Sequence, residues 1–148
     1  MNSKTVQLHS SNMDAYALLA EAQTYMRQQN LGVGANSVFI GRMRENNQGQ
    51  NVSAMYMEHY PGMTEKQLEK ITANAAQKWP LQHCIVRHRY GNIQPGDDIV
   101  LVATWSEHRD AAIRSCEYII EELKARATFW KKETLATDGS TRWVDSKA

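Results

Sequence analysis

Two lysines near the C-terminal end of the chain are the residues best placed to do chemistry. Lys124 lies on the flank of an amphipathic stripe, and Lys131 follows seven residues later, next to Phe129 and Trp130. A lysine loses its proton more easily when its stem lies along apolar surface and other cations crowd its ammonium group. Such an amine can transfer protons or attack a carbonyl carbon. The last quarter of the sequence therefore predicts acid/base or covalent chemistry at a lysine.

Two further pairs of cations could bind an anion. Arg42 and Arg44 alternate along a predicted strand, so both project from one surface. His108 and Arg109 fall in the first turn of a predicted helix, where backbone amides and the helix dipole favour a phosphate. Each pair also has a simpler interpretation. The arginines could face solvent with a carboxylate partner such as Glu58, and the other pair could be ordinary helix surface.

Length and composition restrict the kind of protein. A chain of 148 residues can form one hydrophobic core, so we expect a single domain over residues 1–148. Its 17 basic and 16 acidic residues give a net charge of +1, which favours neither nucleic acid nor an anionic membrane as partner. Because the sequence has no apolar run of membrane-spanning length and no signal-peptide pattern at its start, we expect a cytoplasmic protein.

The sequence predicts neither a metal site nor a resident cofactor. Cys84 and Cys116 fall at apolar positions without a CxxC spacing, which favours buried thiols in a reducing compartment. The histidines His59, His83 and His88 lack the regular spacing of a metal cluster. Neither a phosphate-binding glycine loop nor a serine nucleophile motif occurs in the sequence.

Hydrophobic periodicity predicts the order of the secondary-structure elements. Strands are expected at residues 5–8, 37–44, 52–58, 83–90 and 98–105, with a candidate last strand at 142–144. Helices are expected from about Asn12 to Gln28, from Thr64 to Trp79, and after Ser106. Thr64 with Gln67 predicts a capping box, and Ser106 is the predicted cap of the last helix.

The end of the last helix is left open by the pattern. If the helix continued through Thr128, Lys124 and Lys131 would project from the same side, two turns apart. The threonine and the aromatic pair that follows it could also end the helix sooner.

Strands that occur in adjacent pairs favour an α+β fold with a largely antiparallel sheet and helices on one face. A dinucleotide-binding fold would instead alternate single strands with helices and begin with a glycine-rich turn. Here Gly32 and Gly34 precede a strand, so we exclude that class.

A series of short motifs in a fixed order covers more than two thirds of the chain. They are Gly34, Ala35, Phe39, Gly41 and Arg44; Tyr56 and Glu58 to Met63; Trp79 and Pro80; His88 and Arg89; Pro95 and Gly96; Ser106, His108 and Arg109; Leu123, Lys124 and Arg126; Phe129 to Glu133; and Arg142 to Val144. The series resembles the large, catalytic subunit of molybdopterin synthase, the MoaE family.

The resemblance implies a sulfurtransferase. Enzymes of this family convert cyclic pyranopterin monophosphate into molybdopterin by forming its dithiolene, a step of molybdenum cofactor biosynthesis. Each sulfur comes from a thiocarboxylate at the Gly-Gly end of a small ubiquitin-like partner subunit. The resemblance further implies a homodimer within a heterotetramer and a fold similar to an α/β hammerhead.

The resemblance also implies the site residues. Lys124 and Lys131 match the catalytic lysines of the family. The positions that match substrate-binding segments are Arg42, Met43, Arg44, His108, Arg109, Lys124, Lys131, Lys132 and Glu133. Glu133 is expected to orient Lys131 or Arg126. Two departures from the family pattern stand near these positions: Glu45, which could pair with Arg42 or Arg44, and Thr128, which replaces a frequent proline.

A second class of function fits the same cations. A noncatalytic α+β module that binds a phosphate-bearing ligand or a partner protein would need the charges but no reactive lysine, and a family member that has become a scaffold would behave likewise. An RNA-binding module is disfavoured, because the strands lack the aromatic and basic pattern of RNP motifs.

Overall fold

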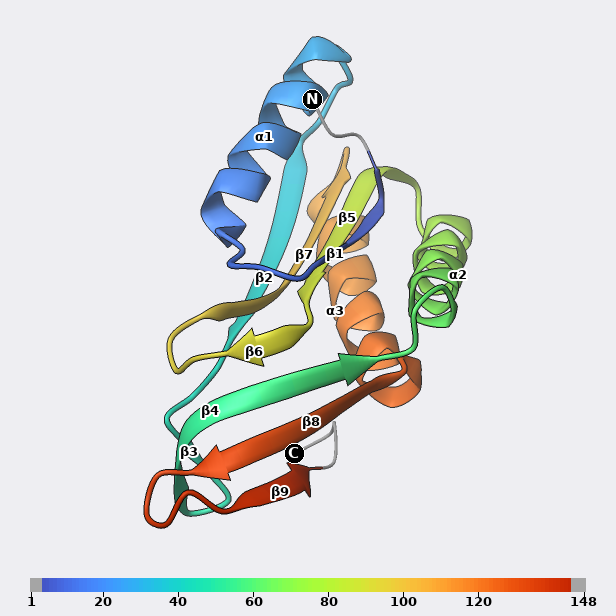
Figure 1. Cartoon of the computed structure of the whole chain (residues 1–148). Helices are drawn as coiled ribbons and strands as arrows, with labels where there is room; N and C mark the ends of the chain where they lie inside the picture. The colour runs from blue at the N-terminus through green and yellow to red at the C-terminus, as the bar shows by residue number, and fades with distance from the viewer. Residues whose placement is uncertain (1–3, 145–148) are drawn as a thin grey trace.

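The computed structural model describes residues 4–144, which form strands and helices in the order drawn in Figure 1. The elements are β1 (Val6–His9), α1 (Ala15–Gln28), β2 (Ala35–Arg42), β3 (Asn46–Asn47), β4 (Gln50–His59), α2 (Met63–Lys78), β5 (Leu81–Arg89), β6 (Gly91–Ile93), β7 (Asp98–Ser106), α3 (Arg109–Arg126), β8 (Phe129–Leu135) and β9 (Thr141–Val144).

The first sheet has the strand order β1-β5-β7-β2. Neighbouring strands are antiparallel except for β1, which runs parallel to β5. The prediction of an α+β fold with largely antiparallel strands is confirmed. Since β5 and β7 are nearly continuous in apolar residues, both faces of this sheet can be covered by helices.

The helices lie on two faces, which corrects the expectation of one. Val86 and Val102 belong to the core under α2 and α3, whereas Ile85 and Leu101 belong to a second core under α1. Figure 1 shows α1 on the opposite side of the sheet from α2 and α3. The physical reason is the alternation of side chains along a strand, which gives each strand two apolar faces here.

A second sheet runs across the lower end of the first in Figure 1. Its strand order is β3-β4-β8-β9, and β6 pairs with the free edge of β4. The polar segment predicted as a turn contains β3 and a two-residue hairpin, in which Gln48 and Gly49 have φ angles of 54° and 76°. The candidate last strand is β9, paired with β8.

Helix α3 ends at Arg126, so it does not continue to Lys131. Ala127 is extended, with φ −69° and ψ 140°. The hydroxyl of Thr128 lies 2.7 Å from that of Thr64 on α2, and Lys131 belongs to β8. A contact between distant segments therefore fixes where the chain leaves the helix.

Both predicted helix caps were wrong in detail. Helix α2 is capped by Gly62, whose N–H donates to the Glu65 carboxylate at 3.2 Å, and Thr64 is buried. Helix α3 has His108 as its N-cap, while Ser106 belongs to β7 and its hydroxyl donates to the His108 carbonyl.

Two other features bear on earlier expectations. Cys84 and Cys116 are buried free thiols, as the sequence predicted. In the part of the chain that the structure describes, every helix is too short or too polar to cross a membrane.

Candidate active site

One cavity of about 390 Å³ opens where the two sheets and the end of α3 meet. Its lining comes from segments far apart in the sequence: Phe39, Gly41 and Arg42 of β2; Arg44 after it; Met57 of β4; His88 of β5; Ile99 and Val100 of β7; Leu123 and Lys124 of α3; Ala127; and Phe129 and Lys131 of β8. A cavity of this size can hold a small organic molecule. The apolar residues form its walls, and the charged residues supply its chemistry.

The charge of the cavity is positive. Arg42, Arg44, Lys124 and Lys131 line it, and no aspartate or glutamate is among the described residues of the lining. Cations brought together near a low-dielectric wall attract anions more strongly than the same cations in open water. The arrangement can therefore bind a small anionic ligand even though the whole chain is nearly neutral.

The two arginines differ in how their charge is compensated. Nε of Arg42 donates to Oδ1 of Asp98 at 2.8 Å, and its guanidinium carbon lies 5.6 Å from the Tyr16 ring centroid. Hydrogen bonding to Tyr16 and then to Asp98 raises the pKa of Arg42. The partner of Arg42 is thus Asp98 and not Glu58. Arg44 instead donates to the neutral amide oxygen of Asn47 at 3.4 Å.

Glu45 does not neutralise either arginine. Within residues 4–144 it forms no ion pair, and its backbone carbonyl accepts from the Val52 amide at 2.7 Å. The Glu45 carboxylate therefore does not pair with Arg44, contrary to the expectation from the sequence.

The two lysines reach the cavity from different elements. Lys124 is exposed on the last turn of α3, and Lys131 is half-buried on β8. Because side chains alternate along a strand, the neighbouring Lys132 projects from the other face of the sheet, where its ammonium lies 5.7 Å from the ring centroid of Trp143. Lys132 does not line the cavity.

A histidine that the sequence reasoning did not select lines the cavity. His88 is buried, its ring is stacked on Phe129 with centroids 3.8 Å apart, and Nδ1 lies 2.7 Å from the Arg89 carbonyl oxygen. Burial lowers the pKa of His88 to about 4, so the ring is neutral near pH 7 and Nδ1 donates to that carbonyl. A histidine inside the apolar run of β5 was the signal that could have found it.

Four other predicted residues lie away from the cavity lining. Met43 is packed in the hydrophobic core. His108 and Arg109 stand at the start of α3, about 22 Å along the helix axis from Lys124. Glu133 is buried on β8, where its carboxylate accepts hydrogen bonds from Arg142 and Asn47 and not, as expected, from Arg126.

The fold and the cavity define a class: an α+β protein with a cationic cavity that is large enough to hold a small molecule. The chain belongs to the MoaE protein family, whose model matches residues 10–126. A molybdopterin synthase catalytic subunit from Pseudomonas aeruginosa is 47% identical over 122 residues, which cover 82% of this chain and 80% of the relative.

Solved structures agree with this assignment. The molybdopterin biosynthesis MoaE protein from Burkholderia ambifaria is 43% identical, with a TM-score of 0.78 over 97% of this chain and 90% of that one. Molybdopterin synthase from Staphylococcus aureus is 31% identical, with a TM-score of 0.81 over 97% of this chain and 98% of that one.

Proposed function

We propose that this chain is the catalytic subunit of a molybdopterin synthase, a sulfurtransferase of molybdenum cofactor biosynthesis. It transfers sulfur from the C-terminal thiocarboxylate of a small ubiquitin-like subunit to cyclic pyranopterin monophosphate and so forms the dithiolene. The observation that carries the proposal is the meeting of Arg42, Arg44, Lys124 and Lys131 in one cavity whose described lining holds no carboxylate.

The charges suit the reactants. The pterin carries a phosphate and the incoming tail ends in an anionic thiocarboxylate, so the two repel each other when they approach. Cations already in place offset that repulsion without any rearrangement at the moment of reaction. Each transfer forms a C–S bond at a side-chain carbon of the pterin while a C–O bond of that carbon breaks. Water then replaces the sulfur on the acyl carbon of the partner, whose tail leaves as a carboxylate.

Each cation has a distinct role in this proposal. Arg44, which forms no ion pair with a carboxylate within residues 4–144, binds the phosphate through paired N–H donors. Lys124 transfers protons or forms a transient attachment at the sulfur-transfer centre, and Lys131 stabilises developing negative charge. Because Lys124 is exposed in the single chain, the arriving tail of the small subunit would be what shields it from water.

The proposal includes the assembly that membership of the family implies. The sulfur donor is the Gly-Gly tail of the small subunit, and two copies of this chain form a homodimer within a heterotetramer. The chain acts as one domain in the cytoplasm, with no nucleic acid or membrane as partner. The reaction as proposed needs neither a metal ion nor a resident cofactor.

His108 and Arg109 act across the homodimer. They stand at the opposite end of α3 from Lys124, too far to touch the same ligand within one chain. We infer that they reach the substrate in the cavity of the second protomer.

The experiment is reconstitution with purified components. The chain is incubated with a thiocarboxylated small subunit and cyclic pyranopterin monophosphate, and dithiolene-containing pterin is measured. Product in proportion to the thiocarboxylate consumed is expected. Binding of the pterin phosphate without any product would instead identify the noncatalytic binding module.

A further inference from the structure

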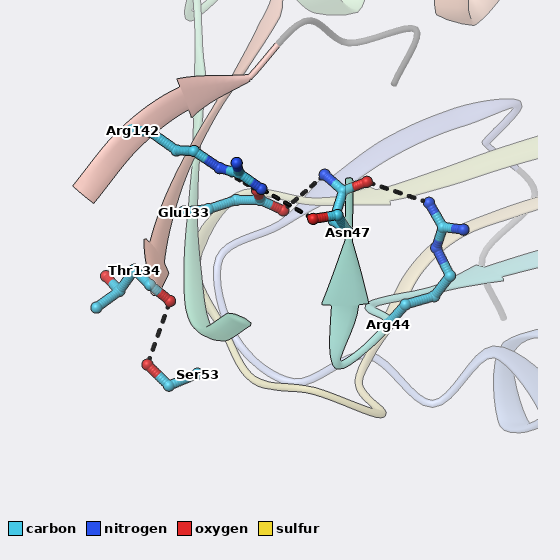
Figure 2. A network of polar contacts seen from close by, with 6 residues as sticks. All are labelled: Arg44, Asn47, Ser53, Glu133, Thr134 and Arg142. Carbon is cyan, nitrogen blue, oxygen red and sulfur yellow. Dashed lines mark hydrogen bonds and ion pairs between the residues drawn. The ribbon is translucent and has the colours of Figure 1, made fainter. Parts of the chain in front are cut away.

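We propose that Asn47 and Arg142 are positioning residues that hold the Arg44 guanidinium at the cationic cavity. Neither residue lines the cavity or touches the ligand site. Both belong to a network of polar contacts that links the loop after β2 to strands β8 and β9, and Figure 2 shows this network from close by. The inference rests on the proposed function only for the identity of the anion that Arg44 meets.

Asn47 connects Arg44 to a buried carboxylate. Its Oδ1 accepts from a terminal nitrogen of Arg44 at 3.4 Å, and its Nδ2 donates to Oε2 of Glu133 at 3.0 Å. The bond to Glu133 fixes which way the amide faces, so the oxygen must point toward Arg44 (Figure 2). The orientation of a side chain on the rim is thereby set by a residue inside the sheet.

Arg142 fixes the other end of the network. It donates to Oε1 of Glu133 from Nε at 3.2 Å and from a terminal nitrogen at 3.1 Å. The same terminal nitrogen donates to the backbone carbonyl of Asn47 at 3.0 Å. Arg142 thus neutralises the buried carboxylate and also fastens the backbone of β3 to β9.

The neutrality of Asn47 matters for the charge of Arg44. A carboxylate at this position would orient the guanidinium equally well but would compensate its charge, as Asp98 does for Arg42. An amide orients Arg44 while leaving its positive charge for the ligand. The negative charge of Glu133 is compensated by its ion pair with Arg142, which does not line the cavity.

The geometry of β3 explains why such a device is needed. The strand has only two residues and ends in the Gln48-Gly49 turn, where Gln48 adopts the left-handed conformation that a residue with a Cβ resists. A short hairpin of this kind holds little order on its own. Its contacts with Glu133 and Arg142 keep Arg44, three residues earlier, in a constant place.

The test uses Asn47→Ala, because Arg142→Ala would leave the buried Glu133 carboxylate without its cation and destabilise the fold. We expect Asn47→Ala to raise KM for the pterin phosphate about tenfold while kcat changes by less than about twofold. Asn46→Ala is the matched control, since Asn46 lies in the same strand and its side chain bonds, among the described residues, only to that of Asn51 at 3.4 Å. It should change KM by less than about twofold.

A double-mutant cycle separates positioning from a general structural effect. In the Arg44→Ala background, Asn47→Ala should raise KM by less than about twofold, because the group that it positions is gone. A tenfold rise in that background as well, or equal effects of Asn47→Ala and Asn46→Ala, would overturn the proposal.

The outcome can be distinguished from a failure of the proposed function. Titration calorimetry measures the binding of inorganic phosphate to each variant and does not depend on turnover. If the wild-type chain makes no dithiolene pterin, the proposed function fails, yet about tenfold weaker phosphate binding by Asn47→Ala than by Asn46→Ala still supports positioning. Equal phosphate affinities, or no phosphate binding by the wild-type chain, would count against it.

Discussion

Lys124 and Lys131 belong to different elements, the end of α3 and the start of β8, yet both line one cavity. The chain turns between them at Ala127, and the contact between Thr64 and Thr128 holds that turn in place. The two amines are therefore brought together by a change from helix to strand and not by helical spacing.

Side chains alternate along β8, so Lys131 and Lys132 project from opposite faces of the sheet and should differ in their effect on the reaction. Lys131→Ala should lower kcat/KM for dithiolene formation by at least about a hundredfold, because it removes the cation that we propose to stabilise charge in the transition state. Lys132→Ala should change it by less than about threefold, since Lys132 faces Trp143 on the other side of the sheet. Steady-state kinetics of both variants make the comparison. Equal losses would mean that the cavity of the single chain is not the reaction site.

Mixed dimers test the role of His108 and Arg109. Lys124→Ala and Arg109→Ala should each be nearly inactive alone. If Arg109 acts in the cavity of the second protomer, unfolding and refolding the two variants together should restore about a quarter of wild-type activity, because half of the dimers are mixed and each has one intact site. No recovery in verified mixed dimers would mean that Arg109 serves the cavity of its own protomer, and an active Arg109→Ala homodimer would remove Arg109 from the reaction.

Stability should fall in mild acid because of His88. Burial lowers the pKa of His88 from 6.5 to about 4, so the unfolded chain takes up this proton first as the pH falls. Above about pH 6.5 His88 is neutral in both states and does not lower the free energy of unfolding. As the pH falls toward 4, protonation of His88 in the unfolded chain lowers the free energy of unfolding by roughly 3 kcal/mol. Burial also lowers the pKa values of His9 and His83, which act in the same direction.

Urea unfolding of wild type and His88→Gln at about pH 7.5 and about pH 5 measures this contribution. The variant should lose part of the pH dependence, while the exposed control His108→Gln should keep it. The same pH dependence in wild type and His88→Gln would show that the ring does not stay neutral in the fold.

Gly34 should tolerate no side chain. A Cβ at this position would lie 2.1 Å from the Glu107 carbonyl oxygen, a backbone atom that cannot move aside without shifting the start of α3. Gly34→Ala is expected to cost about 2–3 kcal/mol of unfolding free energy. Gly32→Ala is the matched control, because nothing lies within 4 Å of its added Cβ. The thermal unfolding midpoint of Gly34→Ala should lie clearly below that of Gly32→Ala. Similar midpoints would contradict the close approach of Gly34 to the Glu107 carbonyl oxygen.

The thiols should be unreactive in the folded chain. Burial raises the pKa of Cys84 to about 11 and also raises that of Cys116, so little thiolate forms and reagents cannot reach it. At about pH 8, labelling by a thiol reagent should be at least about a hundredfold slower than in denaturant. Rapid labelling of native protein would point to opening of the core at α3 or β5.

The sequence alone was sufficient to predict most of the helices and strands and the basic residues that line the cavity. The apolar runs of β5 and β7 predicted buried strands, and ordered motifs predicted the family. It could not predict that α1 covers a different face from α2 and α3, because a strand with two apolar faces does not specify which helix covers which. The predicted helix caps failed for a similar reason, since Thr64 is bonded to Thr128 from another part of the chain.

The site divides in the same way. Residue types and local spacing identified Arg42, Arg44, Lys124 and Lys131, because charge and periodicity are properties of short segments. Only the tertiary structure decided that these four meet, that His88 joins them, and that Glu133 pairs with Arg142 instead of a cation of the cavity. Those contacts join residues from separate elements, and they depend on how the two sheets and α3 pack, which local sequence patterns do not encode.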